Sequence, residues 1–181
     1  MLFRSSTHAH HSGHLRPRAV VGRDTRASGE FLDHAISAGL AAAGMDVTRV
    51  GVLPTPAIAH LTASQDVDLG VVISASHNPF PDNGIKFFAR GGYKLEDAVE
   101  DQIEAALSAE LPHPTGAAVG RVIKGETVAD QAYISHLVDS VGTDISGLRI
   151  VVDAANGAAS VVGPAAQLPR SEERRVGKEC R

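Results

Sequence analysis

The sequence predicts an α/β fold, a three-layer α/β/α domain in which helices cover a largely parallel sheet. Two observations carry this prediction. Short apolar runs with the length of buried strands alternate with segments of helical periodicity in the first half of the chain. The order strand–helix–strand–helix–strand is typical of βαβ units, whose strands run parallel. The 181 residues, 43% of them apolar, are enough for one such domain and the start of a second.

Each element of the first half has its own local signal. Ser28 is a candidate N-cap, and the apolar residues after it recur at near-helical spacing as far as Gly44, a candidate C′ residue. Pro56 opens the second helix at its first turn. The predicted elements are strand Ala19–Val21, a helix from Ser28 to Gly44, strand Val47–Val52, helix Thr55–Ser64 and strand Leu69–Ile73.

The second half begins with Ser74–Gly84, a loop rich in Ser, Asn and Pro. A small hairpin is expected next, with Gly91 and Gly92 in its turn. Helices are predicted over Leu95–Ala109 and Val128–Val141 with a linker at Pro112–Gly116, and a fresh strand at Ile150–Asp153. The acidic residues of the Leu95–Ala109 helix are interpreted as a solvated face rather than a metal cluster.

Both ends of the chain differ from its middle. Residues 1–17 include four of the nine histidines and no apolar periodicity, so a disordered or non-native leader is favoured over a histidine metal site. Arg170–Cys180 resembles, residue for residue, a translated sequencing adapter, and we therefore expect residues 170–181 to be artefactual. The predicted domains are 18–142, which contains a candidate catalytic serine loop, and 143–169, the beginning of a second domain.

The composition argues against nucleic-acid binding, cysteine chemistry and membrane insertion. The net charge of -4 and the absence of Trp argue against a nucleic-acid partner, because phosphate binding needs clustered basic residues and single strands need aromatic platforms. The only Cys lies in the artefactual tail, so no cysteine chemistry is expected. No run approaches the ~20 apolar residues of a membrane span, and no signal-peptide h-region is present. We expect no membrane partner and a cytoplasmic protein.

The strongest chemical signal lies directly after the third predicted strand, where α/β sheets place their sites. Ser76 is a potential nucleophile or phosphate carrier, and His77 and Lys86 can put positive charge beside a phosphate. Asn83 and Gly84 permit the positive φ angles of a tight turn that would fold Lys86 back toward Ser76. Ser-His-Asn-Pro can equally be an ordinary turn, and physics alone leaves the two interpretations open.

Four motifs in order resemble the α-D-phosphohexomutase superfamily. Ile73–Phe88 (ISASHNPFPDNGIKFF) resembles its active-site loop, and Gly22–Gly29 (GRDTRASG) its upstream motif. Gly51–Pro56 (GVLPTP) is similar to the next block, and Gly147–Ala159 (GLRIVVDAANGAA) to the opening of its second domain. The resemblance implies the phosphohexomutase domain I, incomplete at its N-terminus, and the start of a second similar domain. It also implies an intramolecular phosphotransferase whose substrate is a hexosamine phosphate.

The resemblance implies a role for each candidate residue. Ser76 would carry the phosphoryl group, and its phosphate oxygen would be the one ligand to Mg²⁺ that this chain retains. Lys86 would be the general acid/base, with a solvated hairpin lysine as the alternative. His77 would neutralise phosphate charge, or be a loop histidine fixed by a backbone hydrogen bond. Arg26 would point at the loop and bind phosphate, or form an ion pair that stabilises the loop. Asn78 would shape the turn and is, with Arg26, a candidate for binding the substrate or its phosphate.

The sequence departs from the superfamily pattern in several places. The usual amino-terminal segment with an active-site Arg, the metal loop with three Asp residues, and the third and fourth domains are not found. We therefore expect a fragment without activity of its own. The alternatives are a phosphomannomutase or phosphoglucomutase of the same superfamily, a non-catalytic sugar-phosphate-binding fragment, and a chain that folds badly. Oligomeric state is not predicted.

Overall fold

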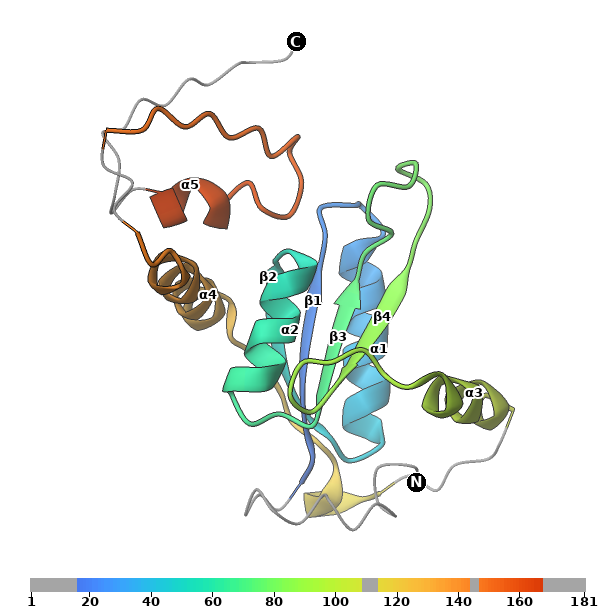
Figure 1. Cartoon of the computed structure of the whole chain (residues 1–181). Coiled ribbons are helices and arrows are strands. Elements are labelled where there is room, and N and C mark those ends of the chain that lie inside the picture. The colour runs from blue at the N-terminus through green and yellow to red at the C-terminus, as the bar shows by residue number, and fades with distance from the viewer. Residues whose placement is uncertain (1–15, 109–113, 144–146, 168–181) are drawn as a thin grey trace.

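The computed structural model of the chain describes residues 16–108, 114–143 and 147–167. Within these residues a five-stranded sheet lies between α1 (Gly29–Ala42) on one face and α2 (Thr55–Ser64) on the other (Figure 1). The α4 helix (Glu126–Ser140) packs outside α2. The predicted three-layer α/β/α fold is therefore confirmed.

The sheet is parallel except at one edge. Its strand order is β4 (Ile85–Ala89), β3 (Leu69–Ile73), β1 (Arg18–Arg23), β2 (Asp46–Val52) and β5 (Val122–Lys124). The β1 strand pairs in parallel with both β2 and β3, and β5 joins β2 in parallel. Only β4 runs antiparallel, against β3. The connection between β3 and β4 therefore begins and ends on neighbouring strands.

Apolar side chains fill both faces of the sheet. Alternate residues of β1 and β3 point to opposite sides, so Val20 and Val72 pack under α2, whereas Val21 and Val71 pack under α1. The α2 face is the larger core, because Tyr133 of α4 and Val162 of the short helix α5 (Val162–Gln167) join it. Central strands that are buried on both faces show the continuous apolar runs from which they were predicted.

The predicted elements of the first half are confirmed to within a few residues. Gly44 has φ +92° after α1, as expected of a C′ residue. Ser28 occupies the N-cap position, but its hydroxyl donates to the Asn83 side chain instead of capping the helix. The hairpin is also confirmed, since Phe88 pairs with Lys94 around Gly91 and Gly92, whose φ angles are +92° and +80°.

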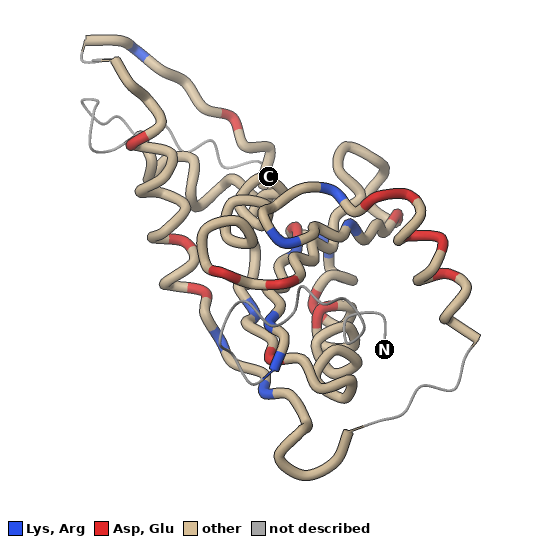
Figure 2. The backbone as a smooth tube through the Cα atoms, turned by 60° about the horizontal axis from the view of Figure 1, so that its bottom comes forward, with Lys and Arg blue, Asp and Glu red and all other residues tan. Residues whose placement is uncertain are grey.

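The second half differs more from the sequence prediction. The α3 helix (Asp97–Ala106) is shorter than expected and contains no buried residue, and its acidic positions recur along it (Figure 2). The edge strand β5 and the short 3₁₀ helix Gly116–Ala118 were not predicted. The predicted strand Ile150–Asp153 is wrong: this segment pairs with no strand of the described residues, and Val151 is 95% exposed. An apolar run becomes a strand only where a neighbouring strand satisfies its peptide groups.

Three sequence predictions lie wholly or partly outside the described part of the chain: the 1–17 leader except its last two residues, residues 112–113 of the predicted linker, and the 170–181 tail. Among the helices of the described residues, none combines the length and apolar character needed to cross a bilayer.

Candidate active site

The candidate site is a pocket of about 480 Å³ at the carboxyl ends of β1, β2 and β3. The β1 strand continues into α1 on one face of the sheet, and the neighbouring β2 continues into α2 on the other. Such a point, where adjacent strands connect to opposite faces, is where open α/β sheets bind ligands. The pocket is lined by Asp24, Thr25, Arg26, Pro54, Thr55, Ser74, Ser76, Asn78, Phe80, Ala154, Ala155, Gly157, Ala158 and Ala159.

Backbone hydrogen bonds hold the three strand ends together beneath the pocket. The Asp24 N–H donates to the Ile73 carbonyl at 2.9 Å, and the Leu53 N–H donates to the Arg23 carbonyl at 3.1 Å. The β2 strand contains one extra residue beside Val21 and Gly22, and Gly51 at this bulge has φ +69°. The loops that follow the strands therefore start from fixed positions.

The loop between β3 and β4, residues 74–84, carries the candidate serine and is called the serine loop below. Its two ends are joined by the Ser74 N–H, which donates to the Gly84 carbonyl at 2.8 Å. A Cβ atom at Gly84 would lie 2.7 Å from the Ser74 carbonyl oxygen. The predicted positive φ at Asn83 and Gly84 is wrong, since neither residue has one. The glycine is needed for the close approach of two backbone segments instead.

Ser76 has the unusual backbone conformation in this loop. Its φ is +58°, a left-handed conformation that costs an ordinary L-residue about 1–2 kcal/mol. The side chain is exposed and lines the pocket, and its Oγ lies 3.3 Å from Nδ1 of His77. The Ser76 N–H donates to Oγ of Ser74 at 3.2 Å. Strained backbone held by its surroundings is typical of functional sites.

Arg26 reaches the serine loop from the end of β1, as the sequence analysis predicted. Its side chain is buried, with 8% of the residue exposed. Its Nη1 donates to the carbonyls of Pro79 (2.5 Å) and Asp82 (3.1 Å), and its Nη2 to those of Ser76 (3.2 Å) and Asn78 (2.8 Å). Its Nε donates to Asp24 at 3.0 Å. These bonds occupy all five N–H donors of a guanidinium, which favours the loop-stabilising alternative over phosphate binding.

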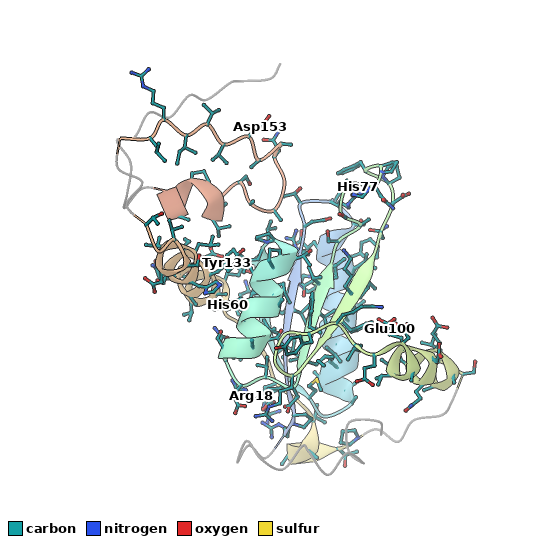
Figure 3. The ribbon with its side chains drawn as sticks, viewed as in Figure 1. Arg18, His60, His77, Glu100, Tyr133 and Asp153 are labelled. Carbon is teal, nitrogen blue, oxygen red and sulfur yellow. The ribbon has the colours of Figure 1, made fainter. Side chains whose placement is uncertain are left out.

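Of the other candidate residues, His77 and Asn78 lie close to Ser76, whereas Lys86 lies outside the pocket lining. His77 lies at the exposed tip of the serine loop, at the same end of the molecule as Asp153 (Figure 3). Asn78 lines the pocket, and its N–H closes a turn on the Ala75 carbonyl at 3.1 Å. Lys86 sits in β4 opposite Val72, so it shares the α2 face of the sheet, but it does not line the pocket. Its exposed ammonium forms no hydrogen bond or ion pair with a described residue.

Sequence reasoning missed two parts of this site. Ser74 anchors the Ser76 peptide group, a role with no motif signal beyond the spacing of two residues. The segment 154–159 closes one side of the pocket, with Ala155 and Asn156 at φ +46° and +54°. An Asn-Gly dipeptide is typical of a turn, but nothing in it indicates that this turn faces the serine loop.

The described residues do not form a complete magnesium site. Among them no group of three or more His, Cys, Asp or Glu side chains is placed to hold a metal. Asp24 is the one carboxylate that lines the pocket, and both of its oxygens accept hydrogen bonds from Arg26. A phosphate on Ser76 would add one oxygen ligand, fewer than the six that Mg²⁺ takes.

Comparison with known proteins identifies the family. Residues 5–113 match phosphoglucomutase/phosphomannomutase, alpha/beta/alpha domain I. A crystal structure of a phosphoglucomutase/phosphomannomutase family protein from Burkholderia thailandensis superposes with a TM-score of 0.70 and 29% identity, over 86% of this chain and 34% of that one. The chain belongs to the phosphoglucomutase/phosphomannomutase family, and its serine loop lies within the matched domain.

Two curated relatives are more similar in sequence. The phosphoglucosamine mutase of Thermobifida fusca is 61% identical over 151 residues, which are 83% of this chain and 33% of that protein. The phosphoglucosamine mutase of Nocardia farcinica is 56% identical over 170 residues, which are 85% of this chain and 37% of that protein. The chain thus spans about a third of the length of the curated relatives it matches.

Proposed function

We propose that this chain is the phosphoserine-bearing domain of a phosphoglucosamine mutase, which interconverts glucosamine 6-phosphate and glucosamine 1-phosphate. The observation that carries the proposal is Ser76, which is exposed in a left-handed conformation on a braced loop beside the pocket. Identities of 55–61% to several relatives named phosphoglucosamine mutase favour this sugar over glucose or mannose.

The proposed reaction has two balanced phosphoryl transfers. In the first, the bond between phosphorus and Oγ of phosphorylated Ser76 breaks while a sugar hydroxyl oxygen bonds to phosphorus, which gives a bisphosphate. In the second, Oγ of Ser76 bonds to the phosphorus at the other position of the sugar while the bond between that phosphorus and its sugar oxygen breaks, and Oγ gives up the proton that it gained on leaving in the first. Each transfer depends chiefly on positioning and on stabilisation of the moving negative charge.

The residues near Ser76 have different proposed roles in these two transfers. His77, whose Nδ1 lies 3.3 Å from Oγ, would stabilise negative charge on the phosphate when it carries a proton. Lys86 would take the proton of the sugar hydroxyl that attacks in the first transfer and give it to the sugar oxygen that leaves in the second, since its amine is exposed and unpaired among the described residues. Asn78 would shape the loop through its turn to Ala75.

Mg²⁺ is the proposed cofactor, and it would supply charge neutralisation at the phosphate. A phosphate oxygen on Ser76 is the only ligand that we assign to it here. The proposed partner is a hexosamine phosphate, and cytoplasmic location stays a prediction.

The test substitutes Ser76 in a protein of the relatives' length that contains this chain. Ser76→Ala removes the oxygen that accepts phosphate, so mutase turnover should fall by at least about a thousandfold, and intact mass should show one phosphate fewer. Ser135→Ala, at an exposed serine of α4, is the matched control and should change neither. Near-normal turnover of Ser76→Ala with phosphate on Ser74 would show that the wrong serine was chosen. Faster turnover of glucose or mannose phosphates would favour the alternative members of the family.

A further inference from the structure

We propose that Arg26 is a positioning residue: its guanidinium is the polar core around which the serine loop folds, and it fixes Ser76 in its left-handed conformation. The sequence analysis treated Arg26 as a candidate phosphate ligand. The contacts give it a different task, because each of its N–H donors already has a protein acceptor.

The serine loop needs such a core because the carbonyls of Ser76, Asn78 and Asp82 accept no backbone N–H of a described residue, and only the fourth carbonyl bound by Arg26, that of Pro79, also accepts one. Pro79 and Pro81 have no backbone N–H, and the side chains of residues 76–83 are all exposed. Besides the Ser74–Gly84 bond that joins its ends, two backbone hydrogen bonds lie within the loop: Asn78 N–H to the Ala75 carbonyl and Asp82 N–H to the Pro79 carbonyl. None of the side chains of residues 76–83, Phe80 included, is buried inside the loop. The carbonyls of residues 76, 78, 79 and 82 turn inward and share one guanidinium instead.

The charge of this core is balanced locally. Asp24 accepts from Nε of Arg26 with one oxygen at 3.0 Å and from the Arg26 backbone N–H with the other at 3.1 Å. The Arg26 side chain is 10% exposed and the Asp24 side chain 14%. A guanidinium that is nearly buried requires a counter-ion and full hydrogen bonding, and this one has both.

A lysine could not replace this arrangement. The guanidinium is a rigid planar fork with five donors, whereas an ammonium offers three donors from a single point. Four carbonyls from different positions of the loop and one carboxylate match the fork and exceed the capacity of the ammonium. Arg26→Lys therefore separates geometry from charge, because it keeps the positive charge and loses the fork.

The consequence for Ser76 follows from its two flanking peptide groups. Its N–H is held by Oγ of Ser74 and its carbonyl by Nη2 of Arg26, so both sides of the strained residue are tied. Without the arginine, the carbonyl side is released and the residue can relax to a commoner conformation. This consequence for phosphoryl transfer rests on the proposed function, whereas the loop's order does not.

The test measures amide hydrogen exchange by NMR in the 181-residue chain, comparing Arg26→Lys and Arg26→Gln with Arg49→Lys. Arg49 is the matched control because it also pairs with a buried carboxylate, Asp33, at 2.8 Å, but holds no loop carbonyl. The amides that report are those of Ser76, Asn78 and Asp82. Both Arg26 variants should exchange these amides at least about tenfold faster relative to the β1 and β3 amides, and Arg49→Lys should not.

A second measurement needs no variant. In the unsubstituted chain the Nε–H of Arg26 should exchange at least about tenfold more slowly than that of Arg121, which is exposed, and millimolar inorganic phosphate should not shift it. Equal exchange of the two Nε–H groups, or a phosphate-induced shift at Arg26, overturns the proposal. So does an Arg26→Lys variant whose loop amides match the unsubstituted chain, because charge alone would then suffice.

An activity measurement separates positioning from general stability. In a protein of the relatives' length, Arg26→Lys should lower kcat while the KM for the sugar phosphate stays within about twofold, because Arg26 contacts the loop rather than the sugar. A raised KM with unchanged kcat contradicts the positioning role. Because the exchange measurements involve no phosphoryl transfer, they stand or fall separately from the proposed mutase activity.

Discussion

Replacing Gly84, at the base of the serine loop, by alanine should lower the free energy of unfolding of the chain. The added Cβ would lie 2.7 Å from the Ser74 carbonyl oxygen and 3.3 Å from Cα of Ala75. Both neighbours are backbone atoms, so no side-chain rotation can relieve the contact. The base of the serine loop must open instead, and the Ser74–Gly84 hydrogen bond holds it closed at 2.8 Å.

The size of the effect follows from these distances. Ordinary van der Waals contact begins at 3.4 Å, so the segments must separate by roughly 0.7 Å. Forcing an extra methyl into a packed site typically costs about 1–3 kcal/mol of unfolding free energy. For a chain of this length that corresponds to a fall in Tm of roughly 2–12 °C.

The assay is thermal and urea unfolding followed by circular dichroism, with Gly39→Ala as the matched control. Gly39 lies in α1 with nothing within 4 Å of the added Cβ, so alanine there should stabilise by about 0.5–1 kcal/mol through helix propensity. The two substitutions add the same methyl group and should have opposite signs. A Gly84→Ala chain that unfolds at or above the unsubstituted temperature refutes the reasoning.

Two further predictions concern the scaffold. Arg49→Met leaves the fully buried Asp33 carboxylate without its counter-ion and should lower the free energy of urea unfolding by about 3–5 kcal/mol. The double variant with Asp33→Leu should restore most of this loss, and full stability of the single variant would contradict the prediction. Burial, and then the stacked His136 ring at 3.8 Å, lower the pKa of His60 below its ordinary value of 6.5. The contribution of neutral His60 to stability should therefore be complete above pH 6.5 and be lost as pH falls through the lowered pKa. Tm should thus fall less steeply on acidification in His60→Gln than in the unsubstituted chain, and parallel Tm profiles would contradict this prediction.

Most of the sheet could be predicted because its central strands are buried on both faces. Leu69–Ile73 has five buried residues in succession, and the sequence prediction matches its bounds. The edge strand β5 has three exposed residues, and its two apolar residues, Val122 and Ile123, are too short a run to predict a strand, so only its pairing with β2 defines it. Ile150–Asp153 is the reverse case: its apolar residues predict a strand, but no described strand lies beside it.

The candidate site could be located from sequence, but its internal bonding could not. The position of Ser76 after a buried strand, and the approach of Arg26 from β1, follow from the parallel topology. The distribution of Arg26 donors over four carbonyls depends on how the serine loop turns, and two prolines with a left-handed serine do not specify this locally. The role of Gly84 was misassigned for the same reason, since a close approach between distant backbones leaves no mark in a dipeptide.

The hydrogen bonds from Arg26 to the serine loop also determine how the loop could be grafted onto another protein. The segment 74–84 is contiguous, but the group that shapes it is encoded 50 residues upstream of Ser76, next to its counter-ion Asp24. A graft of the eleven loop residues alone onto another βαβ scaffold would carry the carbonyls without their donor. The transferable cassette is therefore discontinuous, with Asp24-Thr25-Arg26 at the end of one parallel strand and residues 74–84 at the end of its neighbour.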